Sequence, residues 1–392
     1  DGANIKLRIL DVSWKELARD LGRAIEFDQS QLFKKVYSEE YDTPGGEPFG
    51  VLLADYEIRH RLNAEHRIDD LAALRAAAGV AAAAFAPFIA AAHHTLLDLA
   101  EFAELELPLN LARTFDQAEY VPWNAFRQTE DARFVGLTLP RVLMRPPYRD
   151  DGGRADGFRF QEEVSGPGRD NYLWGNAAYA FGAVLIRAFA ESGWFAQIRG
   201  GEGGGLALGL AALSFGLDRP GVASRPPTDA VVTDAMEQDI GELGFMPLCA
   251  CQDAGAAAFH GNQSVQKPAK FDEPAATANA RLSAMMQYVL CAARFAHYVK
   301  VISREKLGSF TGPADCEDYL RRWLQNYTTA NDEAGPDLKA KHPLREARVQ
   351  VRERPDKPGS YLCVAHLRPH FQLDQLSAGV KLVTELGPGR TG

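Results

Sequence analysis

The most conspicuous candidate for chemistry in this chain is a run of glycines, Arg199–Gly205, which follows a short predicted strand at Trp194–Ile198. A glycine-rich turn after a strand can hold a phosphate group through its backbone N–H groups. No Gly-Lys-Ser or Gly-Lys-Thr follows the run, however, and no G-x-G-x-x-G pattern can be placed across Gly200–Gly209. Glu202 in its centre would repel an anion. We therefore interpret the run as a tight structural loop, and an α/β enzyme that uses it as an anion site is the alternative.

Patterns for metal binding and nucleophilic catalysis are equally weak. Cys249 and Cys251 would point to the same side of a strand, but a zinc site needs a second pair of ligands. His366 and His370 are four residues apart, but Pro369 prevents them from sharing a helical face. The chain contains no H-E-x-x-H and no G-x-S-x-G. We predict a protein that is not an enzyme and has no cofactor or metal; a metal-binding module at the two cysteines ranks third.

The composition is that of an acidic globular protein. The chain has 392 residues, of which 46% are hydrophobic and 24% charged, and its net charge is −9. This length can bury large cores without disulfides. The negative charge argues against nucleic acid as the main partner, because a phosphate backbone needs a basic face. The five cysteines are odd in number and widely spaced, which favours a reducing, cytoplasmic location over a disulfide framework.

One uncharged stretch is long enough to be considered as a membrane span. Ala76–Leu97 contains no Asp, Glu, Lys or Arg. It is rich in alanine, which is only weakly apolar, and Pro87 lies inside it. We therefore expect a buried helix that breaks at the proline, within a helical region over Ile68–Leu99, and no direct membrane insertion.

The elements that would position these residues alternate along the first part of the chain. Ile5–Val12 alternates apolar and polar residues and predicts a strand, and Ser13 with Glu16 predicts a capping box at the start of a helix. Phe49–Ile58 and Phe134–Leu139 predict buried strands. This alternation of strands and helices predicts a mixed α/β fold.

The end of the chain changes from helical to strand periodicity. Pro274–Lys306 predicts the longest helix, and Cys316–Tyr327 predicts a shorter amphipathic one. Ala347–Glu353 and Ser360–Leu367 then predict a hairpin, and Val380–Leu386 a last strand. Little chain remains to cover this small sheet. Because an exposed strand edge readily pairs with another chain, we expect strand addition between chains here.

Long blocks of this sequence resemble a known family, the large subunit of the contractile sheath of the type VI secretion system (the TssC or VipB family). The resemblance extends in order over nearly the whole chain and is carried by long strings rather than one short motif. The matching blocks are Glu26–Tyr41, Gly45–Tyr56, Trp123–Tyr148, Tyr172–Phe181, Ile198–Leu206, Leu243–Leu248, Gln263–Leu282, Arg294–Phe310, Pro343–Ala347 and Leu367–Leu376.

The resemblance implies a structural subunit of the bacterial cytoplasm. Such a subunit would pair with the small sheath subunit TssB (VipA) and stack with other copies of itself in a helical lattice around a tube of Hcp rings. The lattice would attach to a baseplate, contract to propel the tube and its effectors out of the cell, and be recycled by the ATPase ClpV. The implied fold is that of contractile tail sheaths, with a C-terminal strand region shared between protomers.

We expect three regions along the chain. Residues 1–150 would form an N-terminal α/β region, residues 151–310 a central α/β region that ends in the long helix, and residues 311–392 a C-terminal helix with interlocking strands. The expected inter-subunit strand positions are Val349, Val351, Tyr361, Val364, Val380, Leu382 and Val383. The expected tube-facing residues, placed by the family resemblance, are Glu317, Asp318, Arg321 and Arg322.

Overall fold

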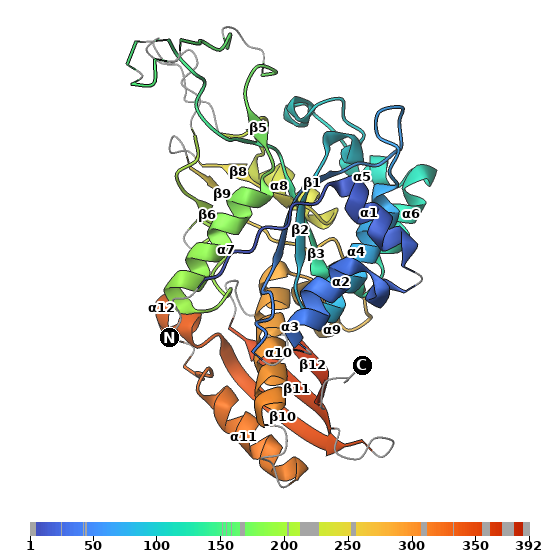
Figure 1. Ribbon diagram of the computed structural model, residues 1–392, viewed down its shortest axis with the longest axis vertical. Coiled ribbons are helices and arrows are strands. Elements are labelled where there is room, and N and C mark those ends of the chain that lie inside the picture. Colours follow the sequence, from blue (N-terminus) through green and yellow to red (C-terminus); the bar gives the residue numbers. More distant parts are fainter. Residues whose placement is uncertain are drawn as a thin grey trace.

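The computed structural model is mixed α/β, as predicted, and is elongated in Figure 1. It describes residues 5–386, except residues 25, 42, 44, 151, 154, 158, 165–168, 202–203, 212–226, 252–255, 307–311, 332, 355–360 and 371–379. The shorter elements are η1 (Phe27–Gln29), α2 (Gln31–Phe33), η2 (Lys34–Ser38), α3 (Glu39–Tyr41), η3 (His94–Leu97), η4 (Phe102–Glu106), α5 (Leu111–Phe115), η5 (Ala118–Tyr120), α6 (Val121–Arg127), η6 (Asp131–Phe134), β4 (Val142–Leu143), β5 (Trp174–Gly175), β6 (Leu206–Ala207), α8 (Asp234–Glu242), β8 (Cys249–Ala250) and β9 (Ala257–Ala258).

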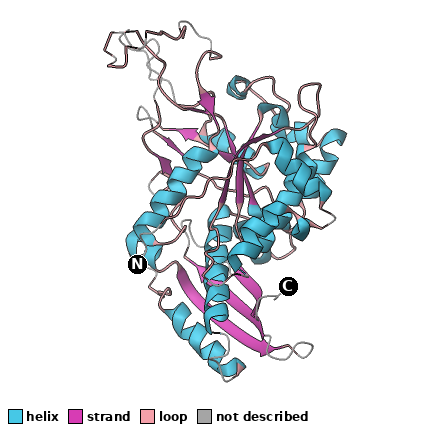
Figure 2. Ribbon diagram, in the orientation of Figure 1, coloured by secondary structure: helices cyan, strands magenta, loops and turns pink. Residues whose placement is uncertain are grey.

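A four-stranded parallel sheet organises the N-terminal body, in the order β1 (Leu52–Ile58), β2 (Phe88–Ala92), β3 (Val135–Leu139) and β7 (Met246–Pro247). Every residue of β2 and β3 is buried, as expected for parallel strands with both faces covered. Figures 1 and 2 show helices on both sides of this sheet.

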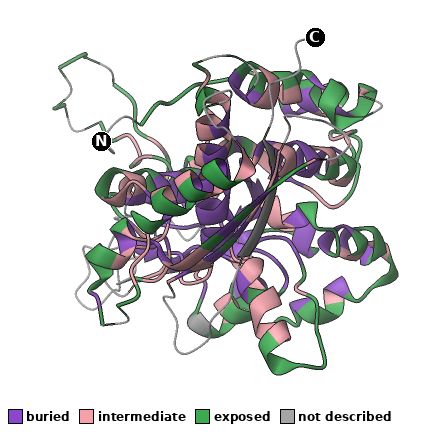
Figure 3. Cartoon of the chain, turned by 90° about the horizontal axis from the view of Figure 1, so that it is seen from below, coloured by how far each residue is buried: buried purple, intermediate pink, exposed green. Residues whose placement is uncertain are grey.

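Two apolar clusters occupy the two faces of the parallel sheet. On one face, α1 (Trp14–Arg23) and α4 (Asp70–Ala84) pack with alternate residues of β2. On the other, α7 (Ala178–Ser192) packs with the intervening Ile89 and with Met246. Figure 3 shows the buried strands running between helices whose outer faces are exposed.

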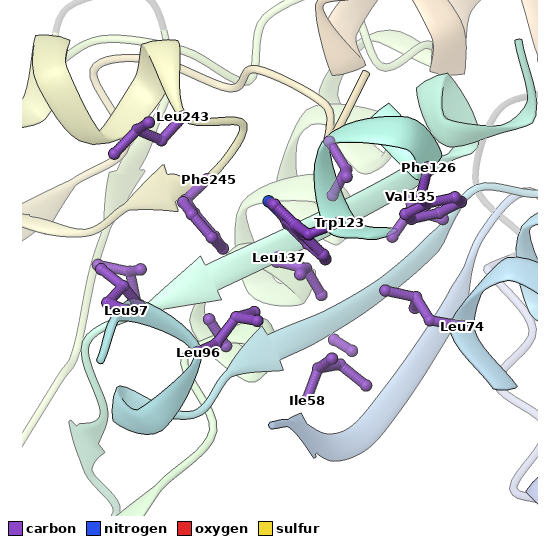
Figure 4. Close-up of a cluster of buried hydrophobic side chains, with 14 of the residues drawn as sticks. Ile58, Leu74, Leu96, Leu97, Trp123, Phe126, Val135, Leu137, Leu243 and Phe245 are labelled. Carbon is purple, nitrogen blue, oxygen red and sulfur yellow. The ribbon is translucent and has the colours of Figure 1, made fainter. Parts of the chain in front are cut away.

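Aromatic rings fill the first of these clusters. The rings of Trp123 and Phe245 stack with centroids 5.8 Å apart, and Phe126 lies against Trp123. Figure 4 shows these rings gathered over the strand that carries Val135 and Leu137. Burial of such large side chains is the main favourable term in folding this body.

The strand predicted at Ile5–Val12 is wrong, although the capping box that follows it is confirmed at Ser13. The segment is extended but has no backbone ladder within the described part of the chain. Leu7 and Ile9 are 78% and 84% exposed. Side chains hold it instead: Lys6 Nζ lies 2.6 Å from Glu47 Oε1, and Tyr56 Oη donates to the Val12 carbonyl at 2.6 Å.

The helical region predicted over Ile68–Leu99 is correct only as far as Ala84. Phe85 takes a left-handed conformation and ends α4, and Pro87 cannot continue the helix. The chain then enters the sheet as β2, where the apolar run is buried on both faces. No helix in the described part of the chain is long and apolar enough to cross a membrane.

The long helix predicted over Pro274–Lys306 is two helices, α9 (Pro274–Ser283) and α10 (Met286–Lys306). The interruption has a backbone cause. The carbonyl of Ala284 accepts from Ser264 N at 3.0 Å, and Met286 N donates to Asn262 O at 2.8 Å. Backbone groups of Asn262 and Ser264 thus replace the hydrogen bonds that would continue the helix. Periodicity cannot reveal such a contact, because the two segments are distant in sequence.

The C-terminal part confirms the predicted helix followed by strands. It contains α11 (Pro313–Gln325), α12 (Pro336–Lys341) and an antiparallel sheet of β10 (Leu344–Glu353), β11 (Tyr361–Pro369) and β12 (Val380–Leu386) in that order. Figure 1 places α10 and α11 beside this sheet, below the parallel one.

Candidate assembly interface

The glycine-rich loop has the geometry of a tight turn against β9. Gly200 N donates to Phe259 O at 2.8 Å, Gly205 N donates to Gly200 O at 2.8 Å, and Phe259 N donates to Gly205 O at 3.0 Å. Gly204 has φ +96°, and a Cβ there would overlap the carbonyl oxygen of Gln197. These three N–H groups are therefore engaged within the fold. Glu202 lies outside the described residues.

The two cysteines considered for a metal are separated by burial. Cys249 is buried in β8, whereas Cys251 is only half-buried. Among the described residues, no group of three or more His, Cys, Asp or Glu side chains could hold a metal ion. Burial raises the pKa of Cys291 and of Cys363 to about 12, so these thiols stay protonated near neutral pH.

The inner face of the C-terminal sheet packs against α10 and α11 in a hydrophobic core formed within this chain. Val349 and Val351, two of the expected inter-subunit positions, are buried there with residues of α10 and α11 such as Phe295 and Leu320. The same core holds Trp194, whose ring stacks on Phe295 with centroids 4.2 Å apart. Substitutions at these two valines would therefore disturb folding before they disturbed any contact between protomers.

The other expected strand positions lie in one ladder within the chain. Tyr361 pairs with Leu386, Val364 with Val383, Ala365 with Leu382, and Leu367 with Val380. Val364 also faces Gln350 of β10, which makes β11 the central strand. The structure thus brings Tyr361, Val364, Val380, Leu382 and Val383 together in one sheet, of which β10 and β12 are the edges.

One expected tube-facing residue is turned toward the sheet. Glu317, on α11, is half-buried, and its Oε2 accepts a hydrogen bond from the backbone N–H of Val351 at 3.0 Å. Asp318, Arg321 and Arg322 are exposed on the same helix. Arg321 pairs with Asp318, and Arg322 Nε donates to the Asp318 carbonyl at 3.2 Å. These three form a small surface group of mixed charge, which we call the α11 charge group.

The sequence patterns also missed the contact between α10 and residues 37–46, which we call the joint. Arg304 donates to the carbonyls of Glu40, Tyr41, Thr43 and Gly46 at 3.0–3.1 Å. One turn earlier, Lys300 Nζ lies 4.8 Å from the ring centroids of Tyr37 and Tyr41 and 5.2 Å from that of Phe85. The signal for this joint was a pair of cations four residues apart at the end of an apolar helix.

His297 lies one turn before Lys300 and is 1% exposed. Its Nε2 lies 3.1 Å from the carbonyl of Ala84, at the end of α4, and its ring centroid lies 5.9 Å from that of Tyr41. Burial, with the neighbouring charges of Arg294 and Lys300, lowers the pKa of His297 to about 3. The imidazole is therefore neutral in the folded state at physiological pH.

Two family models match the N-terminal and the C-terminal parts of the chain. Residues 1–266 match the VipB family described as EvpB/VC_A0108, tail sheath N-terminal domain. Residues 275–386 match the family described as EvpB/VC_A0108, tail sheath gpW/gp25-like domain. The chain is also 40% identical over 385 residues to the type VI secretion system sheath protein TssC1 of Pseudomonas aeruginosa, across 97% of this chain and 76% of that protein. The chain belongs to the VipB family of type VI secretion system sheath proteins.

Proposed function

We propose that this chain is the large subunit of a contractile sheath, a structural protein without catalytic activity that works in the bacterial cytoplasm. It pairs with the small sheath subunit TssB (VipA), and the pairs polymerise around a tube of Hcp rings. The observation that carries this proposal is the similarity to a sheath protein across 97% of the chain. The engaged backbone of the glycine-rich loop supports a structural role over an anion site.

In this proposal, assembly stores free energy and contraction releases it. Each subunit has different packing contacts in an extended and a contracted lattice, and the difference drives the Hcp tube and its effectors outward. The extended lattice begins at a baseplate, and the ATPase ClpV recycles the contracted one. A single contraction therefore requires no chemical reaction in the subunit.

The C-terminal sheet is the proposed site where protomers interlock, through an extended arm from a second copy of this chain. Its strands are antiparallel and β11 is paired on both sides, so an arm must add at an edge. Backbone pairing of this kind joins chains without requiring a specific side-chain pocket. The positions expected for the interlock lie in or beside this ladder.

The α11 charge group is the proposed contact with the tube. Exposed ion pairs contribute only about 0–1 kcal/mol each, so the contact would gain strength from its repetition along many rings. Glu317 was expected in the same contact, but its carboxylate is occupied by Val351. A test of the tube contact should therefore change the exposed charges and leave Glu317 in place.

The proposal is tested by co-expressing the chain with a small sheath subunit and Hcp and imaging the product by electron microscopy. We expect long hollow tubes that retain Hcp. The double variant Asp318→Lys and Arg322→Glu should form tubes with less Hcp, whereas Glu333→Lys, an exposed change on another segment, should retain it. Discrete particles without tubes would contradict the sheath function, and full Hcp retention would remove only the α11 charge group from it.

A further inference from the structure

Glu40 is almost fully buried, at 4% exposed, and is held by both its side chain and its backbone. Its Oε1 is paired with Arg8 of the N-terminal segment, and its Oε2 accepts from Glu47 N at 2.7 Å. Its backbone carbonyl accepts from Arg304, at the end of α10, at 3.0 Å. Two arginines from distant parts of the chain thus bind the same residue.

Two ion pairs attach the N-terminal segment, residues 5–12, to the body, and they differ in burial. Lys6 pairs with Glu47, and these side chains are 61% and 56% exposed. Arg8 pairs with Glu40, whose side chain is only 6% exposed. The two pairs are two residues apart on one segment, so they separate the effect of attaching the segment from the effect of neutralising a buried carboxylate.

The pair with Arg8 matters more because Glu40 is out of reach of water. An exposed ion pair contributes little to stability, since water screens both charges. Removal of one partner of a buried pair leaves a charge unpaired in a medium of low dielectric constant, which is strongly unfavourable. Without Arg8, the Glu40 carboxylate would therefore turn toward solvent or take up a proton.

The backbone of Glu40 is in close contact with that of Gly46. A Cβ on Gly46 would overlap the Glu40 carbonyl oxygen, so little room separates the two. Arg304 donates to the carbonyls of both residues, at 3.0 Å for Glu40 and 3.1 Å for Gly46. A movement of Glu40 toward solvent would therefore displace Gly46 as well and weaken the hydrogen bonds of Arg304.

Arg304 caps the helical stretch formed by α2, η2 and α3, which ends at Glu40 and Tyr41. The last carbonyls of a helix have no partner within it, and a cation at this end is favourable. Tyr41 Oη donates to the carbonyl of Ala84 at 2.8 Å, and the same carbonyl lies 3.1 Å from His297 Nε2. The residues that Arg304 caps are thus also fastened to α4 and α10.

We propose that Glu40 couples the N-terminal segment to the joint, so that detachment of Arg8 loosens the hold of Arg304 on the N-terminal body. By thermodynamic linkage the coupling is reciprocal, and loss of Arg304 weakens the contact of Arg8 by the same factor. The segment is a strap whose release is felt at the end of α10. The inference concerns contacts within one chain and does not depend on the proposed function.

Amide hydrogen exchange at the last turn of α10 tests the coupling in the full chain, because this turn carries Arg304. With Arg8→Gln, we expect exchange at residues 303–306 to become at least threefold faster. Lys6→Gln, which breaks the exposed pair of the same segment, is the matched control and should leave it unchanged. Equal acceleration by both variants, or none by either, would overturn the role of Glu40.

A second change at Glu40 separates the coupling from a simple loss of contact. In the double variant Arg8→Gln and Glu40→Gln no buried charge is left unpaired, and the amide oxygen can still accept from Glu47 N. We expect exchange at residues 303–306 to return to within twofold of the wild type. Exchange as fast as in Arg8→Gln alone would contradict the inference. If Arg8→Gln alone does not fold, recovery of folded protein in the double variant supports the inference, and failure of both variants opposes it.

Denaturant unfolding tests the reciprocity, because two residues that share a partner have non-additive effects on stability. We expect Arg8→Gln to lower the folding equilibrium constant at least fivefold more in the wild-type background than in the Arg304→Ala background. Lys6→Gln should have the same effect in both backgrounds. Equal effects of Arg8→Gln in the two backgrounds would overturn the coupling and leave the sheath function untouched.

Discussion

Lys300 Nζ donates a hydrogen bond to Tyr37 Oη at 3.2 Å and lies 4.8 Å from the centroid of the same ring. The two residues are far apart in sequence and belong to different family domains, residues 275–386 and residues 1–266. Together with Arg304, this contact joins the helix that carries the C-terminal sheet to the N-terminal body. Under the proposed function, such a joint would transmit force between the two domains when the sheath contracts.

Removal of the Arg304 side chain should weaken this joint. Arg304→Ala leaves four carbonyls without their donor, and we expect the free energy of unfolding to fall by about 2–6 kcal/mol, since each lost hydrogen bond contributes about 0.5–1.5 kcal/mol. Arg321→Ala, which removes an exposed arginine, should change it by less than about 0.5 kcal/mol. Denaturant unfolding of the heterodimer measures both. If both variants changed the free energy of unfolding by the same small amount, the joint would contribute nothing to stability.

His297 should make stability fall as the pH drops below neutral. Its folded pKa of about 3 lies below the ordinary value, so the unfolded chain binds a proton first as the pH falls. The contribution of His297 to the free energy of unfolding is fully present above the unfolded pKa of about 6.5 and is lost progressively below it. Between pH 7.5 and 5.5 the loss is about 1.4 kcal/mol.

The measurement for His297 is denaturant unfolding at several pH values in that range. His297→Gln, which cannot titrate, should have a shallower dependence than the wild type by that amount, whatever its own stability. A wild type and a variant with parallel pH profiles would show that the imidazole does not couple to folding in this way.

Gly204→Val should abolish soluble heterodimer, because the new side chain would overlap the Gln197 carbonyl and the residue has a positive φ. Gly201→Ala is the matched control: a Cβ there meets nothing within 4 Å. Soluble yield and saturable nucleotide binding are the two measurements. Nucleotide binding that Gly204→Val abolishes while filaments still assemble would favour the enzyme alternative over the structural loop.

Asn176 should stabilise the parallel sheet at an irregular point. Its Nδ2 donates to Tyr56 O at 3.1 Å and to Ala54 O at 3.3 Å, where the pairing of β1 with β2 shifts register, and its Oδ1 accepts from Ala178 N at 2.8 Å. Asn176→Ala would leave these buried groups unpaired and should lower the free energy of unfolding by about 2–3 kcal/mol. Thermal melting measures this loss, and the exposed control Asn326→Ala should change stability by close to zero. A loss below about 0.5 kcal/mol for Asn176→Ala would contradict the role.

Local sequence determined the elements whose cause is local. Ser13 and Glu16 are three residues apart and form the capping box that their spacing predicts. The alanine-rich helix ends at Ala84, just before Pro87, and the alternation in β10 and β11 yields the predicted hairpin. These features depend on residues within a few positions of one another, so a pattern contains all the information they need.

Only the tertiary structure decided the features that depend on distant partners. Ile5–Val12 has the alternation of a strand, but whether it becomes one depends on a sheet edge elsewhere, and none pairs with it in the described part of the chain. The break before Met286 requires the chain at Asn262, and the turn of Glu317 away from solvent requires Val351. A strand or a carboxylate needs a hydrogen-bonding partner, and the sequence specifies that partner only through the completed fold.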